Sequence, residues 1–299
     1  MKPTKITLSV GLFAIASIVF GQDFTFKVLA NKGNNEVKSN NAWHPLKIGE
    51  SLQQDDELKL ATNAYVGLIH ASGKPVELKE PGSHKVADLA AQVSGGSSVI
   101  NKYTDFILSS NAEGKKNRLS ATGAVHRNLE EATSINVIMP GRDDADVFNN
   151  RVVLNWETEA QGPFVVSVRN MFEDNLATLE TSETGIEIDL GKPELANENA
   201  LFVTVSSKVN SGQSSGQYLI KRLTPSEQMR IKSSFSEIIG EVSEPTALNN
   251  LILAGFYEEN NLLIDAIVAY EDAIKFAPEV TSYEDAYNEF LLRQGLKQE

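Results

Sequence analysis

The sequence predicts a multidomain protein that is mainly β-structured and ends in α-helices. Short runs in which apolar and polar residues alternate occupy residues 24–86 and 148–223, and such alternation is typical of half-buried strands. From Pro225 onward, apolar residues recur at helical spacing instead. We therefore expect five segments: an N-terminal signal peptide (1–21), a small β domain (22–90), a connector with a helix (91–147), a β-sandwich (148–223) and a helical unit (225–299).

The first residues have the order of a secretory signal peptide. Lys2 and Lys5 precede an apolar stretch from Ile6 to Phe20, and polar sequence begins after Gly21. A positive start, an apolar core and a small residue at the junction define such a signal. The stretch is shorter than the ~20 residues that span a bilayer. We expect cleavage near Gly21 and export to the periplasm or beyond; the alternative is an uncleaved N-terminal anchor.

The amino-acid composition excludes several kinds of site and partner. The chain has no cysteine, so it can form neither a disulfide nor a thiolate zinc site and has no thiol nucleophile. Its net charge is −13, and the loss of Lys2 and Lys5 with the signal leaves 25 basic against 40 acidic residues, or −15. Such a chain repels phosphate backbones and anionic lipids. We therefore expect no nucleic-acid partner.

The first β segment resembles a known family. Trp43, Leu46 and Gly49 precede an acidic turn, and the apolar run Ala64–Leu68 leads into a hairpin that contains Gly73. This order is similar to the FecR-like domain, and we assign residues 22–90 to it. The resemblance implies a Gram-negative cell envelope. The sigma-factor regulation known in that family is not expected, because only five residues precede the apolar stretch.

The second β segment carries strand signals at the regular spacing of a sandwich. Trp156 lies early in this segment, inside an apolar run, and we expect it to be a core residue rather than a ligand platform. The segment resembles an immunoglobulin-like or fibronectin type III sandwich. The expected strands are Val152–Trp156, Phe164–Val168, Leu176–Leu179, Ile186–Leu190, Leu201–Val205 and Gln217–Ile220.

The helical end carries the most specific pattern. Small and aromatic residues at i, i+4 and i+7 share one face of the second helix, a proline closes that helix, and the helix before it matches in the same register. The pattern resembles the tetratricopeptide repeat (TPR); the alternative is an ordinary helical hairpin. A single repeat cannot bury its apolar face alone, so neighbouring helices must cover it. The structural positions are Leu253, Ala254, Tyr257, Ala266, Tyr270, Ala273 and Pro278.

The TPR resemblance also implies a partner-binding face. In that family the first helix of each repeat lines a concave surface, and amide and aromatic side chains there suit peptide capture. Residues 225–299 carry 14 acidic and 5 basic residues, so we expect a partner with a basic surface. The predicted partner-binding residues are Asn249, Asn250, Ile252, Phe256 and Glu259.

Residues suited to catalysis or metal binding are scattered, and the sequence predicts no enzyme, cofactor or metal. The four histidines lack ligand spacing, and an acidic loop lacks the order of a calcium-binding EF-hand, so a solvated linker is expected there. These residues are His44, His70, His84 and His126, and Asp143, Asp144 and Asp146.

The expected function is that of an exported, non-enzymatic scaffold or adaptor that mediates protein–protein interaction in the cell envelope. Two alternatives stay open at this stage. An exported glycan- or ligand-binding module would show exposed aromatics in a groove of the sandwich. An enzyme with a dispersed site would show carboxylates that converge in a cleft.

Overall fold

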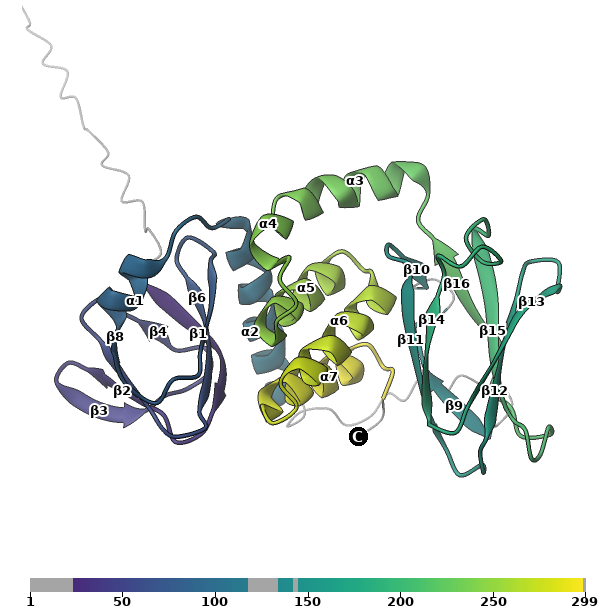
Figure 1. Cartoon of the computed structure of the whole chain (residues 1–299), viewed down its shortest axis with the longest axis horizontal. Coiled ribbons are helices and arrows are strands. Elements are labelled where there is room, and N and C mark those ends of the chain that lie inside the picture. The colour runs from purple at the N-terminus through teal and green to yellow at the C-terminus, as the bar shows by residue number, and fades with distance from the viewer. Residues whose placement is uncertain (1–23, 118–133, 142–144, 298–299) are drawn as a thin grey trace, which may run out of the picture.

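The computed structural model describes residues 24–117, 134–141 and 145–297 (Figure 1). The predicted signal peptide lies outside these residues. Within them, the chain is mainly antiparallel β structure with a helical C-terminal part, as the two periodicities predict. Figure 1 shows an elongated molecule in which the helices lie between two β units.

The N-terminal β unit is built from two four-stranded sheets, ordered β4-β1-β6-β7 and β3-β2-β5-β8. Val28, Leu58 and Leu68 are fully buried in its core. The short helix α1 (Val86–Gln92) follows the last strand. The strands are β1 (Phe26–Lys32), β2 (Glu36–Ser39), β3 (Ala42–Pro45), β4 (Ser51–Leu52), β5 (Glu57–Leu60), β6 (Tyr65–His70), β7 (Pro75–Leu78) and β8 (Gly82–Lys85).

The second β unit is a sandwich of a three-stranded sheet, β14-β11-β9, and a five-stranded sheet, β10-β16-β15-β12-β13. Trp156 is buried in its core and meets Phe164 edge-on, with ring centroids 5.4 Å apart. The strands are β9 (Ile135–Ile138), β10 (Asp146–Val147), β11 (Arg151–Thr158), β12 (Phe164–Arg169), β13 (Asn175–Thr181), β14 (Gly185–Asp189), β15 (Ala200–Ser207) and β16 (Tyr218–Arg222).

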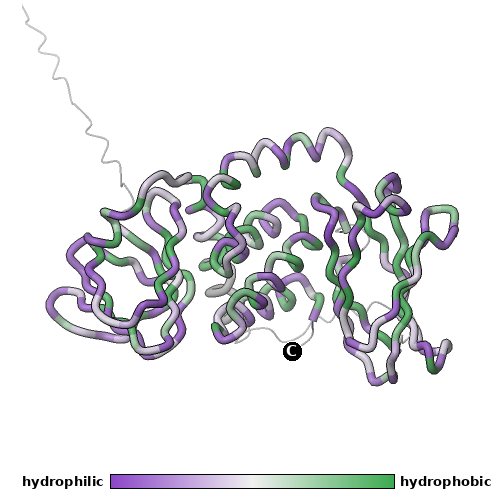
Figure 2. The backbone as a smooth tube through the Cα atoms, viewed as in Figure 1, coloured by the Kyte–Doolittle hydropathy of each residue, from purple (hydrophilic) through white to green (hydrophobic). Residues whose placement is uncertain are grey.

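Helices α3 and α5 begin at threonine caps. Thr224 and Glu227 form a reciprocal capping box at the start of α3, and Thr246 caps α5. Figure 2 shows hydrophobic stretches along the central helices and the sandwich strands, whereas α3 is largely hydrophilic. The helices are α2 (Val99–Asn117), α3 (Pro225–Ser236), α4 (Ile239–Val242), α5 (Ala247–Glu259), α6 (Leu263–Phe276) and α7 (Thr281–Arg293).

The segment expected to be a connector, residues 91–147, is divided among the units. Helix α2 packs against α5 and α7, so it belongs to the helical unit, while β9 and β10 belong to the sandwich. Gly255 permits the close contact: a Cβ there would lie 2.7 Å from Ile107 Cδ1 and 3.1 Å from the backbone oxygen of Tyr103. The helical unit therefore combines a helix that precedes the sandwich in the sequence with helices that follow it. The periodicity of a single segment does not reveal such a combination.

The helical unit and the N-terminal β unit share one apolar core. Leu29, Tyr65 and Ile69 of the β unit are buried in the same cluster as the helix residues Ile107 and Tyr270. The sandwich has a core of its own. The described residues thus form three apolar clusters: one inside the N-terminal β unit, one between that unit and the helices, and one inside the sandwich.

Candidate functional site

The seven TPR-like positions lie along the packing of α5 and α6. Ala254, Ala266, Tyr270 and Ala273 are buried without exposed surface, and Tyr257 is nearly so. Leu253 is half-buried, and Pro278 is exposed between α6 and α7. Small residues at these positions let the two helices approach closely.

The predicted partner-binding face is closed in the structure, which corrects the expectation of an open concave surface. Asn249, Asn250, Ile252 and Phe256 are all buried. Phe256 packs edge-on against Tyr103 of α2, with ring centroids 5.2 Å apart. The physical reason is that α2 and the N-terminal β unit cover the apolar face that the α5–α6 hairpin cannot bury alone.

The amide side chains of this face serve the helix itself. Asn249 Nδ2 donates to the backbone oxygen of Glu244 at 3.0 Å, and Asn250 Nδ2 donates to that of Thr246 at 2.9 Å. Glu259, the fifth predicted residue, is half-buried and pairs with Lys102 of α2 at 2.8 Å. These side chains therefore stabilise the start of α5 and its contact with α2.

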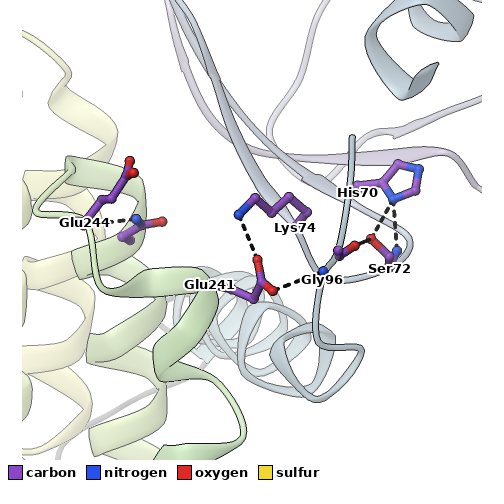
Figure 3. Close-up of polar contacts among 8 residues, drawn as sticks. His70, Ser72, Lys74, Gly96, Glu241 and Glu244 are labelled. Carbon is purple, nitrogen blue, oxygen red and sulfur yellow. Dashed lines mark hydrogen bonds and ion pairs between the residues drawn. The ribbon is translucent and has the colours of Figure 1, made fainter. Parts of the chain in front are cut away.

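A pocket of about 340 Å³ lies beside this face, where the N-terminal β unit meets α4 and α5. Figure 3 shows Lys74, from the β6–β7 hairpin, pointing toward Glu241 of α4. Lys74 Nζ lies 2.7 Å from Glu241 Oε2, and the backbone N–H of Gly96 donates to Glu241 Oε1 at 3.1 Å. The ion pair with Lys74 lowers the pKa of Glu241. Glu241 thus holds two segments of the β unit against the helices.

Glu77 of β7 makes the most direct link across this junction. Its Oε1 accepts from the backbone N–H of Leu248 at 3.0 Å, in the first turn of α5. Burial acts to raise the pKa of Glu77, but hydrogen bonds from Leu248, Tyr65 and Lys79 outweigh it and lower the pKa. A carboxylate at a helix N-terminus satisfies a free backbone donor and complements the helix dipole. The pocket is therefore lined by groups that join two units.

The helical unit meets the sandwich through a second polar contact. Asp265 of α6 accepts from the backbone N–H groups of Phe148 and Asn149 at 2.8 and 2.9 Å. Asn149 Nδ2 donates to Asp265 Oδ1 at 2.8 Å and to the Tyr257 hydroxyl at 2.9 Å. Burial raises the pKa of Asp265 to about 6, although these hydrogen bonds favour the ionised form. We refer to Asp265, Phe148 and Asn149 as the sandwich latch.

Further pairs support the sandwich latch along β11. Arg151 pairs with Asp272 of α6 and, at 2.8 Å, with Glu187 of β14. Asn155 Nδ2 donates to Glu271 Oε1 at 2.8 Å. All of these partners are charged or amide groups, and they surround an apolar contact in which Phe148 packs against Phe235 and Tyr257.

The candidate metal and catalytic residues that the structure describes do not converge. His44 lies 2.6 Å from Glu50, His70 bonds Ser72, and His84 bonds the backbone of Glu80. Within the described ranges, no group of three or more His, Cys, Asp or Glu side chains could hold a metal ion. His126, Asp143 and Asp144 lie outside those ranges. Among the described helices, none has the length and apolar character needed to cross a membrane.

The residues that join the units were not predicted from the sequence, and the reason is the same for all of them. Lys74 and Glu77 of the β6–β7 hairpin, Glu241 and Asp265 are single charged residues, and no local spacing connects them with the groups that they bind. The one available signal is Asp265, an acid in the first turn of a helix between two apolar residues. An acid on an apolar helix face is buried only with partners.

Comparisons with known proteins add little to this geometry. No protein-family model matches the chain, and no curated protein matches it. A solved structure, described as a Ca²⁺-stabilized adhesin that helps an Antarctic bacterium reach out and bind ice, aligns with 66% of the chain at 11% sequence identity and a TM-score of 0.20. The chain spans 41% of that adhesin chain. A likeness at this TM-score carries no argument about fold or function.

Proposed function

We propose that the protein is an exported, non-enzymatic scaffold or adaptor of the Gram-negative cell envelope. The observation that carries the proposal is the enclosure of the helices between two β units, with α5 and α7 against β7 and β1, and α6 against β10 and β11. A helical repeat whose inner face is filled by its own chain acts as a joint. The two β units, held by this joint, then provide the surfaces that meet partners.

The identities of the three units belong to the same proposal. We assign the N-terminal unit to the FecR-like type, the sandwich to the immunoglobulin-like type and the helical unit to the TPR type. The sandwich assignment is supported by its strand order, in which β9 joins the three-stranded sheet and β10 pairs in parallel with β16 of the other. The TPR assignment is supported by the burial of Ala266, Tyr270 and Ala273 on one face.

The proposed partner is another envelope or exported protein with a basic surface. Net charge supports this choice, since the chain carries −13 overall. Exposed acidic side chains attract a basic surface and accelerate its association, and salt weakens that attraction. The partner contact is proposed for the outer faces of the β units, because α2 and the N-terminal β unit occupy the first-helix face of the repeat.

The test begins with the location and start of the protein in its native cells. We expect it in the envelope fraction with an intact mass that corresponds to a start near Gln22. Chemical crosslinking in intact cells, followed by purification and mass spectrometry, should recover a basic protein whose crosslinks fall on the β units. Recovery without crosslinking should decrease as salt is raised.

Three results would refute the proposal. The first is a protein that stays in the cytoplasm with Met1 attached. The second is crosslinks confined to the helices, and the third is turnover of a substrate by the purified protein. Crosslinks to a glycan alone would favour the ligand-binding alternative instead.

A further inference from the structure

The outer edge of the five-stranded sheet differs from the other sheet edges among the described residues. Strand β13 has seven residues, whereas the other edge strands, β3, β4, β7, β8, β9, β10 and β14, have two to five. Native proteins protect long edges with Lys, Pro or a bulge, because unpaired N–H and C=O groups accept a further strand. Strand β13 contains neither Lys, Arg nor Pro, and its register shift lies at its first end. Five consecutive residues, Ala177–Thr181, therefore offer a regular open edge.

This edge lies on the outside of the molecule. Figure 1 shows β13 as the outermost strand at the end of the molecule away from the helices. Asn175, Thr178 and Glu180 are exposed, and the alternate residues are half-buried over the core. The edge is accessible along its length.

A rigid turn next to the edge exposes two large apolar side chains. Phe172 is 84% exposed and Met171 is 56% exposed. Buried Asn170 fixes this turn: its Oδ1 accepts from the backbone N–H of Phe172 and Asp174, and its Nδ2 donates to Asp174 Oδ2. Adjacent exposed aromatic and Met side chains are enriched at protein interfaces. A turn held in place loses little conformational entropy on binding.

The acidic side chains around β13 indicate which kind of peptide segment would bind to this edge. Asp174 and Glu183 are exposed at the two ends of β13. Across the edge, acidic side chains outnumber basic ones by four to two, and both basic ones are already paired, Arg169 with Glu173 and Lys208 with Glu180. A second copy of this chain would bring acidic groups against acidic groups. A segment with Lys or Arg would neutralise them.

We propose that the β13 edge, with Phe172 beside it, binds an extended basic segment of another protein as an added β-strand. Backbone hydrogen bonds to β13 supply affinity in this mode, and side chains at alternate positions supply selectivity. An apolar residue of the segment contacts Phe172, and basic residues pair with Asp174 and Glu183. The proposal deepens the proposed adaptor function, since it names a partner class for one β unit.

The experiment uses the purified mature protein, residues 22–299, and a phage-displayed library of random 12-residue peptides. Selected peptides should alternate apolar and polar residues and be rich in Lys and Arg. A synthetic copy of the most enriched peptide should bind more weakly at high salt. It should also slow amide hydrogen exchange in residues 175–181, where outward N–H groups exchange freely without it.

Variants separate backbone pairing from other contacts. Successive N–H groups of a strand point to opposite sides. Of the two substitutions Ala177→Pro and Thr178→Pro, one therefore removes an N–H that bonds β12, and the other removes only an N–H on the open edge. The variant that keeps the wild-type melting temperature should abolish peptide binding, while Thr178→Ala, which keeps the N–H, should bind normally. Phe172→Ser should weaken binding about tenfold. Met229→Ser is its control, because Met229 is 74% exposed on α3, outside the sandwich.

Equal binding to the stable proline variant would overturn the proposal, as would enriched peptides without basic residues. A wild-type dimer that this proline variant converts to a monomer would also overturn it, because the strand would then come from a second copy. These outcomes are separable from failure of the proposed function. A cytoplasmic location would refute the adaptor role and leave the peptide result intact, and a failed peptide selection would leave the crosslinking result intact.

Discussion

The helical unit meets the two β units in opposite ways. Toward the N-terminal β unit the contact is a continuous apolar core that includes Leu29, Tyr65 and Ile69. Toward the sandwich, the apolar contact is smaller, with Ile264 in the sandwich core and Phe148 against the helices, and the sandwich latch adds buried hydrogen bonds. A shared core makes two units one cooperative body, whereas a polar contact lets them part. We therefore expect the sandwich and the rest of the molecule to unfold in separate transitions.

The two contacts also differ in what can disturb them. Apolar burial has no charge to titrate or screen, so it changes little with pH and salt. A hydrogen-bonded carboxylate depends on its own protonation. The chain offers two reporters for this comparison, because its two tryptophans, Trp43 and Trp156, lie one in each β unit. The variants Trp43→Phe and Trp156→Phe each leave a single reporter.

The largest effect is expected from Gly67→Leu, which forces the apolar interface apart. A Cβ at Gly67 would lie 3.0 Å from Leu248 Cδ1 and 3.2 Å from Ala30 Cβ, so the remaining Leu atoms have no room. Overpacking of this kind costs about 3 kcal/mol. Urea unfolding followed by Trp43 fluorescence should shift to lower urea, together with the loss of helical circular dichroism, while the Trp156 signal stays in place.

Gly216→Leu is the matched control, because a Cβ at Gly216 meets no atom within 4 Å. It should leave both transitions unchanged. If Gly67→Leu moved the Trp43 transition and left the helical signal in place, the shared core would not be one cooperative body.

A smaller effect is expected from Asp265→Ala, which opens the sandwich latch. The variant leaves the backbone N–H groups of Phe148 and Asn149 without their acceptor, at a cost of about 2 kcal/mol at pH 5. The cost should shrink toward pH 7. The pKa of Asp265 rises from 3.8 unfolded to about 6 folded, so the folded state holds a proton that the unfolded state has released. Wild-type stability therefore falls as pH rises from about 4 to 6, and the alanine variant lacks this slope.

Urea unfolding followed by Trp156 fluorescence, repeated from pH 4 to 7, measures this slope. Asp189→Ala provides the control, because exposed Asp189 also accepts a backbone N–H, that of Gly191 at 2.8 Å. Water replaces that bond, so its loss should be under about 0.5 kcal/mol. Parallel pH profiles for wild type and Asp265→Ala would show that the sandwich latch does not titrate.

The arrangement of elements was largely predictable from local patterns. The six strand signals between Val152 and Ile220 correspond to β11–β16, and the helical periodicity after Pro225 corresponds to α3–α7. Alternation and caps act within a few residues, so sequence carries them directly. Membership of α2 in the helical unit was not predictable in this way, because a partner for an apolar face can come from anywhere in the chain. For the same reason, the sequence led to the wrong prediction of a partner-binding face on α5. Ile252 and Phe256 are apolar because α2 covers them.

The joining residues were less predictable than the fold. Glu77 and Leu248 lie far apart in the chain, and a carboxylate that caps the helix of another unit has the same local sequence as a solvated one. Burial decides between the two, and burial is a property of the assembled molecule. The exposure of Phe172 was equally unpredictable. A Met-Phe pair in a sequence suggests core residues, and only the turn around Asn170 directs it outward.

The smallest effect is expected from Glu77→Gln, which tests the carboxylate that β7 places at the N-terminus of α5. Gln keeps an oxygen for the Leu248 N–H but loses the charge at the α5 N-terminus, worth about 0.5–1 kcal/mol. The pKa of Glu77 is lowered below its ordinary 4.5, so this stabilisation is complete above about pH 4.5 and disappears as pH falls through the folded value. Urea unfolding by Trp43 fluorescence should therefore separate Glu77→Gln from wild type at pH 7, by a difference that shrinks as pH falls from 4.5 toward 3. Exposed Glu80→Gln should match wild type at pH 7 and at pH 3. An undiminished difference at pH 3 would show that Glu77 acts through packing rather than through its charge.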